Sequence, residues 1–169
     1  MNWRRSRSFL LPVSDLAKIR IWLSIFILGL VLSGLTAFPL ESELRLFAQF
    51  INADASSTQS GFASWIVRVR DALIDTNQKY PFLAYGTDWL AFAHLAIAVA
   101  FIGPWRDPVR NIWVVQFGMI ACAMVVPLAF IAGAIRGIPI YWRLIDCSFA
   151  VIGIVPLSFV HRLIRKSQR

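Results

Sequence analysis

Residues 85–103 read YGTDWLAFAHLAIAVAFIG, and this stretch decides how the rest of the chain is interpreted. As a helix it is apolar and long enough to cross the roughly 30 Å hydrocarbon core of a membrane. It nevertheless carries Asp88 near one end and His94 near its middle. An ionisable side chain costs roughly 2.5 kcal/mol or more in the middle of a membrane-spanning helix, so each of these two needs a partner or a function.

The composition of the whole chain is that of a membrane protein. Of its 169 residues, 58% are hydrophobic and only 15% are charged, which is far more apolar than a soluble domain of this size. Four apolar runs of about 20 residues nearly fill the chain and leave no room for a separate soluble domain. The sequence therefore predicts an all-α bundle of four transmembrane helices, which forms a single integral membrane domain over residues 1–169.

The predicted spans cover residues 19–38, 82–103, 112–135 and 140–160. The first apolar run is too long for the hydrophobic core of a cleaved signal peptide, and no small-residue cleavage site follows it. We therefore expect an uncleaved first span. Gly29 and Ser33 lie four residues apart on this span, a spacing that lets another helix approach closely.

Residues 41–80, between the first and second spans, are more polar. Their apolar side chains form two helical stripes, separated by the turn-rich sequence NADASSTQSG at 52–61. One stripe contains Leu44, Phe47, Phe50 and Ile51, and the other contains Phe62, Trp65, Ile66, Val69 and Leu73. This pattern predicts two short amphipathic helices, which either lie in the membrane interface or pack over the bundle as a lid.

The distribution of Lys and Arg predicts how the chain is threaded. Eleven of these 17 residues lie near the two termini or in the connector at 104–111, and six lie on the opposite side. Cytoplasmic segments carry an excess of Lys and Arg, so both termini are predicted to be cytoplasmic, in a bacterial inner membrane. The net charge of +8 is then explained by orientation and by contact with membrane lipids, and nucleic acid is not expected as a partner.

The polar residues of the last three spans are predicted to gather on the outer side. Asp88 and Asp146 both lie about 9 Å below the start of their spans, at matching depth on two helices. Arg143 and Asp146 are three residues apart and can pair within one helix. His94 lies deeper and on another face than Asp88, so these two are not an obvious dyad. The candidate polar pocket consists of Asp88, His94, Arg136, Arg143 and Asp146.

Three roles are open for this cluster. In the first, the charges neutralise one another and fix the helix register. In the second, an arginine binds an anionic group such as a phosphate, an aspartate acts as a base and His94 relays a proton. The third is the passage of ions or protons. We favour a non-enzymatic structural or accessory subunit of a membrane complex or homo-oligomer, and we assign no catalytic residue.

No metal or cofactor is predicted. The sequence has no Cys/His cluster at metal-ligand spacing, and it lacks catalytic signatures such as a P-loop or HExxH. Cys122 and Cys147 both fall within apolar segments, where a cysteine usually packs as a small hydrophobic residue.

The order of polar residues in the second and fourth spans resembles that of VanZ-like membrane proteins. Asp88 opens the second span with His94 further along it, and Arg143 and Asp146 stand at the start of the last span, ahead of Gly153. The chain departs from the family pattern in that His94 follows Asp88 by six residues instead of four. The resemblance implies an envelope protein linked to glycopeptide resistance, and it carries over no settled chemistry. Combined with the candidate polar pocket, it gives an alternative to the accessory subunit: a VanZ-like envelope protein that binds or processes a lipid-linked anionic substrate at an outward-facing pocket.

Overall fold

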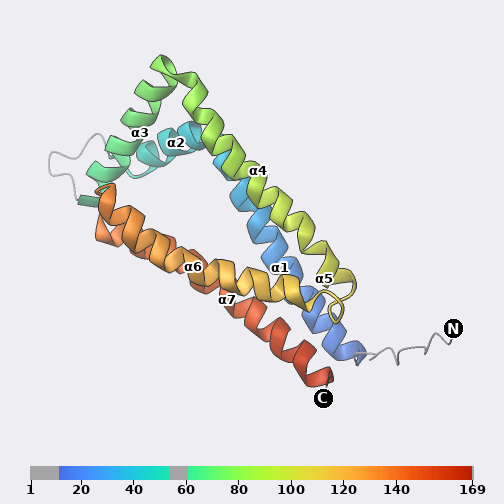
Figure 1. Cartoon of the computed structure of the whole chain (residues 1–169). Coiled ribbons are helices and arrows are strands. Elements are labelled where there is room, and N and C mark those ends of the chain that lie inside the picture. The colour runs from blue at the N-terminus through green and yellow to red at the C-terminus, as the bar shows by residue number, and fades with distance from the viewer. Residues whose placement is uncertain (1–11, 54–60, 169) are drawn as a thin grey trace. The chain divides into compact units, whose positions relative to one another are not determined.

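The computed structural model describes residues 12–53 and 61–168, and the regular structure of these residues is entirely helical (Figure 1). The elements are α1 (Val13–Ala37), α2 (Leu40–Phe50), α3 (Gly61–Lys79), the 3₁₀ turn η1 (Pro81–Ala84), α4 (Tyr85–Ala100), α5 (Ile102–Arg106), α6 (Ile112–Ile135) and α7 (Ile140–Ser167). Four segments are long and apolar enough to cross a membrane: α1, Pro81–Arg106, α6 and α7. The predicted all-α fold, with four spans and two shorter helices between the first and second, is confirmed.

The observed spans differ from the predicted ones mainly at their ends. α6 has the predicted bounds, but α1 begins at Val13 and α7 continues to Ser167. The end of α7 carries Arg165 and Lys166 in its last turn, where basic side chains favour the helix and interact well with its dipole. The second span is less regular than predicted, because η1 precedes α4 and the helix is interrupted at Phe101 before α5.

The chain divides into two compact units. The first unit consists of Met1–Gly29 and Ala98–Arg169, and the second consists of Leu30–Ile97. The first unit therefore holds the start of α1 together with α5, α6 and α7, whereas the second holds the end of α1, the α2–α3 hairpin and nearly all of α4. That the whole chain acts as one membrane domain stays a prediction.

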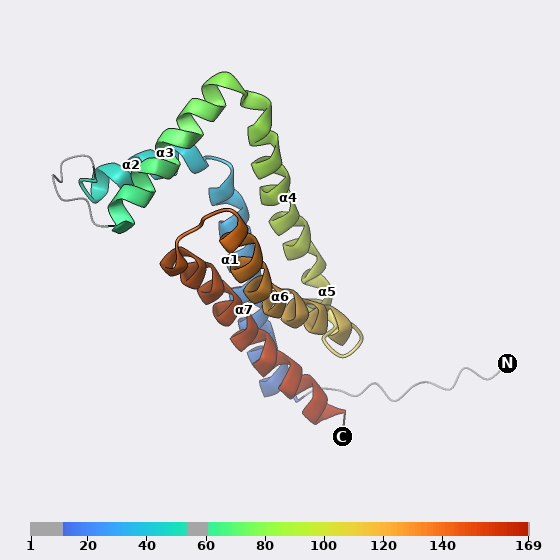
Figure 2. The same ribbon diagram turned by 60° about the vertical axis from the view of Figure 1, so that its left-hand side comes forward.

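In the first unit, α6 and α7 form an antiparallel hairpin and lie side by side along their length (Figures 1 and 2). Two glycines allow this close approach. A Cβ atom on Gly118 would lie 2.6 Å from the ring of Phe101 and 2.8 Å from Leu157, and one on Gly153 would lie 2.8 Å from the sulfur of Cys122. All three distances are shorter than a real Cβ contact, so neither glycine position accepts a larger residue without movement.

The core of the first unit is closed by side chains from α1. The ring of Phe26 lies 4.7 Å from that of Phe101, and Trp22 stacks on Phe159 with ring centroids 5.5 Å apart. Such ring pairs add to the stability that burial alone provides. The fully buried side chains around them are Ile19, Leu23, Val115, Leu157, Val160 and Ile164.

In the second unit, the end of α1 packs closely against α4 at Gly34. A Cβ atom there would lie 2.9 Å from the carbonyl oxygen of Ala91 and 3.1 Å from Leu95. The small residue at this contact is Gly34, and a close approach of another helix at Gly29 and Ser33 stays a prediction. Gly29 is exposed, and a Cβ atom added there would meet no other atom within 4 Å among the described residues.

The α2–α3 hairpin combines a small apolar core with a polar bridge. Ala48 and Ile66 are buried, and the rings of Phe47 and Phe62 meet edge to face at 6.4 Å. Phe50 belongs to the predicted stripe but is 83% exposed, so only part of that stripe faces α3. Both predicted positions of this hairpin, in the membrane interface or over the bundle as a lid, stay predictions.

Candidate functional site

Asp88 lies in the first turn of α4 and is half-buried. A carboxylate at this position interacts favourably with the positive N-terminal end of the helix dipole. Among the described residues, its side chain makes no hydrogen bond or ion pair. Asp88 thus lies where the helix dipole favours a carboxylate, and no basic side chain pairs with it in the described part of the chain.

His94 has a partner on its own helix. Its Nδ1 atom lies 2.8 Å from the carbonyl oxygen of Leu90, one turn earlier. A carbonyl oxygen only accepts, so Nδ1 is the donor in this contact. No hydrogen bond joins His94 to Asp88 within the part of the chain that the structure describes.

Arg143 is held by the turn between α6 and α7. Its Nε donates to the carbonyl oxygen of Ile138 at 2.7 Å, and its aliphatic stem lies over Gly133, where a Cβ atom would come within 2.9 Å of it. The predicted Arg143–Asp146 ion pair is not found among the described residues. Side chains on a helix lean toward its N-terminus, so Arg143 reaches back to the turn and away from Asp146.

The geometry of this turn explains why a carbonyl is available. Gly137 has a φ of +68°, the N–H of Ile138 donates to the carbonyl of Gly133, and the N–H of Gly137 donates to that of Ala134. These two bonds define a Schellman motif, in which a glycine ends the helix in a left-handed conformation. The sequence Gly-Ile-Pro after Arg136 is a recognisable signal for it, and our sequence reasoning missed it.

The structure brings three of the five predicted pocket residues to one end of the α6–α7 hairpin. Arg136 is exposed directly after α6, while Arg143 and the half-buried Asp146 lie in the first two turns of α7. The other two, Asp88 and His94, belong to the second unit. A pocket that combines all five stays a prediction.

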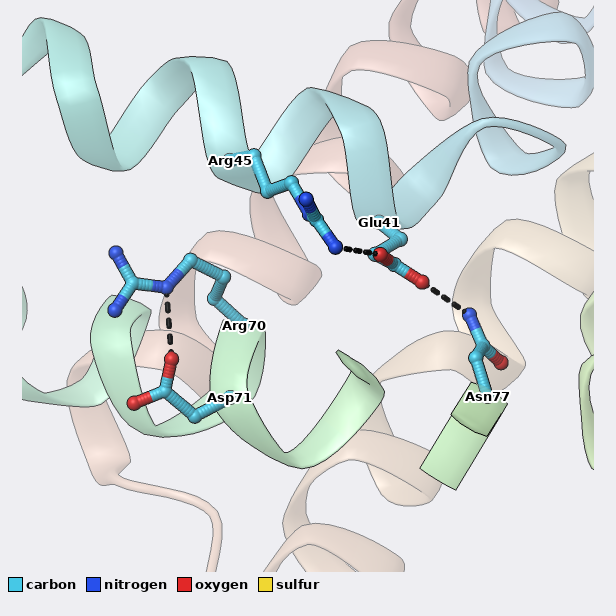
Figure 3. Close-up of polar contacts among 5 residues, drawn as sticks. All are labelled: Glu41, Arg45, Arg70, Asp71 and Asn77. Carbon is cyan, nitrogen blue, oxygen red and sulfur yellow. Dashed lines mark hydrogen bonds and ion pairs between the residues drawn. The ribbon is translucent and has the colours of Figure 1, made fainter. Parts of the chain in front are cut away.

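A polar bridge outside the spans links α2 to α3 (Figure 3). Asn77 donates to one oxygen of Glu41 and Arg45 donates to the other, both at 2.6 Å. The hydrogen bond from Asn77 and, second, that from Arg45 lower the pKa of Glu41 below its usual value. Arg70 and Asp71 form a separate ion pair at 2.8 Å on α3.

A second polar grouping lies at the other end of the α6–α7 hairpin, and sequence reasoning did not single it out. Arg20 of α1 stacks over the ring of Trp105, at 5.0 Å from its centroid, and its Nε lies 3.4 Å from the Trp105 carbonyl oxygen. The indole nitrogen of Trp105 donates to Ser24 at 3.1 Å. The spacing of four residues between Arg20 and Ser24, which puts both on one helix face, was the available signal.

Metal-binding groups of three or more His, Cys, Asp or Glu side chains do not occur within residues 12–53 and 61–168. Cys122 and Cys147 are free and half-buried, and Cys122 packs against Gly153. Neither cysteine belongs to the predicted set of pocket residues, and Cys122 has a packing role.

The chain matches no family model, and no curated protein or solved structure shows a significant similarity to it. What the fold defines is therefore the class: a multi-pass integral membrane protein with four candidate spans. The orientation of its termini and the kind of membrane stay predictions.

Proposed function

We propose that this membrane protein is a non-enzymatic structural or accessory subunit, which assembles laterally as a homo-oligomer or within a larger membrane complex. The observation that carries the proposal is the small share of each span that the chain itself covers. Only 17 to 22% of the residues in the most apolar part of each span are buried within the chain. Most of the lateral surface is therefore open to lipid or to other helices.

The open space beside Gly29 indicates that one face of α1 contacts a partner helix and not lipid. The spans contain glycines with a clear packing role inside the chain, because Gly34, Gly118 and Gly153 each have an atom within 3 Å of where a Cβ would lie. Among the described residues Gly29 has no such neighbour, and Ser33 is exposed one turn later. A glycine weakens a helix and offers little surface to lipid, whereas a small-xxx-small pair lets a second helix pack closely.

The test is the number of copies in particles extracted directly from the membrane with a polymer. Two tags on separate copies and single-molecule photobleaching report how many chains each particle holds. We expect more than one copy, or a stoichiometric partner, for the unmodified chain. Gly29→Leu is expected to reduce this assembly, whereas Ala93→Leu, on an exposed position of α4, leaves it unchanged. Recovery of the unmodified chain as single copies without a stoichiometric partner would refute the proposal.

A second candidate is a VanZ-like envelope function, in which an outward-facing pocket binds or processes a lipid-linked anionic substrate. It is supported by the two positive charges at the α6–α7 turn, since neither Arg136 nor Arg143 forms an ion pair among the described residues. An arginine without a carboxylate partner is suited to a phosphate.

Binding of a polyprenyl phosphate to the protein in phosphatidylcholine vesicles tests this candidate. Arg143→Gln is expected to weaken binding, and Arg68→Gln, which removes an exposed charge from α3, serves as the matched control. Equal binding by the unmodified chain and Arg143→Gln would exclude the turn as the anion site.

A further inference from the structure

One end of the first unit concentrates positive charge. Two contacts bring its elements together: Nε2 of His161 in α7 lies 3.4 Å from the amide of Gln116 in α6, and Trp105 of α5 is bonded to Ser24 of α1. The start of α1, α5 and the end of α7 accordingly lie at this same end in both views (Figures 1 and 2). The basic residues it carries are Arg20, Arg106, Arg110, Arg162, Arg165 and Lys166.

Acidic side chains do not neutralise this charge. None of these six basic residues forms an ion pair within residues 12–53 and 61–168. Asp107, in the adjoining connector, accepts from the backbone N–H of Arg110 at 3.1 Å, and Asp15 lies 3.9 Å from Lys18. All six basic residues except the half-buried Arg20 are exposed, and their charges leave a positive field that attracts anions.

Arg20 differs from the other five because its guanidinium is fixed in place. The ring of Trp105 supports it on one side, and its Nε is directed at the Trp105 carbonyl, while Ser24 holds the indole. Both terminal nitrogens of Arg20 remain without a partner in the described part of the chain. A guanidinium that is already oriented, with its two terminal donors free, matches the geometry of a phosphate group.

Apolar surface beside Arg20 favours a lipid over a soluble anion. Ile21 and Ile25 are 60% and 52% exposed on α1, so an acyl chain has surface to contact next to the guanidinium. Trp105 lies against the Arg20 guanidinium, and tryptophan is enriched at the level of the lipid headgroups.

We infer that this end of the first unit is a binding site for an anionic phospholipid. The terminal nitrogens of Arg20 donate to the headgroup phosphate, the surrounding Arg and Lys residues attract the negative headgroup, and the acyl chains lie along α1. The inference goes beyond lateral assembly and does not depend on it.

Native mass spectrometry of the full-length protein, equilibrated in detergent with phosphatidylglycerol or phosphatidylcholine, tests the site. We expect the unmodified protein to retain phosphatidylglycerol in preference to phosphatidylcholine. Arg20→Gln is expected to reduce the affinity for phosphatidylglycerol about tenfold, the effect of one lost charge-assisted contact. Arg20→Lys should also bind less well, because an ammonium offers no planar pair of donors.

Arg68→Gln is the matched control, since it removes one exposed positive charge from the second unit and should leave lipid retention unchanged. Trp105→Phe keeps an aromatic ring beside Arg20 but removes the hydrogen bond to Ser24. It should weaken the retention of phosphatidylglycerol even if Arg20→Gln proves unstable. Retention by Arg20→Gln or Arg20→Lys equal to that of the unmodified protein would overturn the site. Displacement of phosphatidylglycerol by millimolar inorganic phosphate would also overturn it, because the site would then bind a free anion.

Discussion

Replacing Gly34 by valine is expected to destabilise the contact between α1 and α4. The new Cβ would lie 2.9 Å from the carbonyl oxygen of Ala91 and 3.1 Å from Leu95, whereas ordinary van der Waals contact begins near 3.4 Å. The carbonyl belongs to the backbone of α4 and cannot rotate away. The two helices must therefore move apart, or the valine side chain must adopt a strained conformation, as in other overpacked interiors.

The magnitude follows from known overpacking costs. Extra methyl groups in a packed interior destabilise by about 1–3 kcal/mol, and valine recovers only a few tenths of a kcal/mol of that through its better helix propensity than glycine. We expect a net loss of about 1–3 kcal/mol. Leu95→Ala in the same chain should restore part of it by removing the side-chain contact, but not the backbone contact, so the two substitutions will not be additive.

Reversible unfolding by sodium dodecyl sulfate in mixed micelles, followed by circular dichroism, measures this loss. Gly86→Val is the matched control, because Gly86 is exposed in the first turn of α4 and its Cβ would meet none of the described residues within 4 Å. Its effect should stay within about 0.5 kcal/mol. If Gly34→Val unfolds at the same detergent fraction as Gly86→Val, the close packing of α1 on α4 is wrong.

Three further predictions concern other parts of the chain. Gly118→Ala should lower stability by about 1–3 kcal/mol in the same unfolding assay, because the new methyl meets two fully buried side chains. Arg143→Gln should lower the thermal midpoint in detergent by losing its bond to the turn, whereas Asp146→Asn should not, and equal effects would contradict this assignment. The pKa of Glu41 is lowered in the folded state, so its bridge is complete above the ordinary value of 4.5 and is lost as the pH falls through the lower pKa of the folded state. Spin-label distances between α2 and α3 should therefore broaden on acidification, and much less so in Glu41→Gln.

The spans could be predicted from the sequence because hydropathy is a property of each segment by itself. α6 was predicted with its observed bounds, since Asn111 and Arg136 flank a run that contains no charged residue. The ends of α1 and α7 were predicted less well, because polar residues such as Arg165 continue a helix beyond the apolar part. Hydropathy reports where a helix can cross a membrane, and not where the helix ends.

Contacts between helices could not be predicted in the same way. Gly29 and Gly34 both lie on α1, and both are small enough for a close contact, but only Gly34 faces α4. Five residues turn a helix by about 140°, so the choice between them depends on how α1 is rotated about its axis. No local pattern in the sequence fixes this rotation.

One contact expected among the candidate pocket residues, the Arg143–Asp146 ion pair, was wrong for a similar reason. A spacing of three residues between Arg143 and Asp146 permits an ion pair, but the direction of the side chain and the free carbonyl of Ile138 decide the outcome. That carbonyl is available because Gly137 ends α6 with a left-handed residue. The local turn, and not the charge pattern, determines what the arginine binds.

The basic residues at this end of the first unit bear both on the orientation of the chain in the membrane and on lipid binding. Experiments can separate these two effects. The same excess of Lys and Arg that predicts a cytoplasmic location also supplies the field around Arg20. Orientation depends on the number of charges on a side, so one substitution leaves the excess in place. Lipid retention, in contrast, depends on one oriented guanidinium stacked on Trp105. Arg20→Gln should therefore reduce lipid retention without changing the labelling pattern of cysteines introduced on either side, and a change in topology would mean that Arg20 acts through its charge alone.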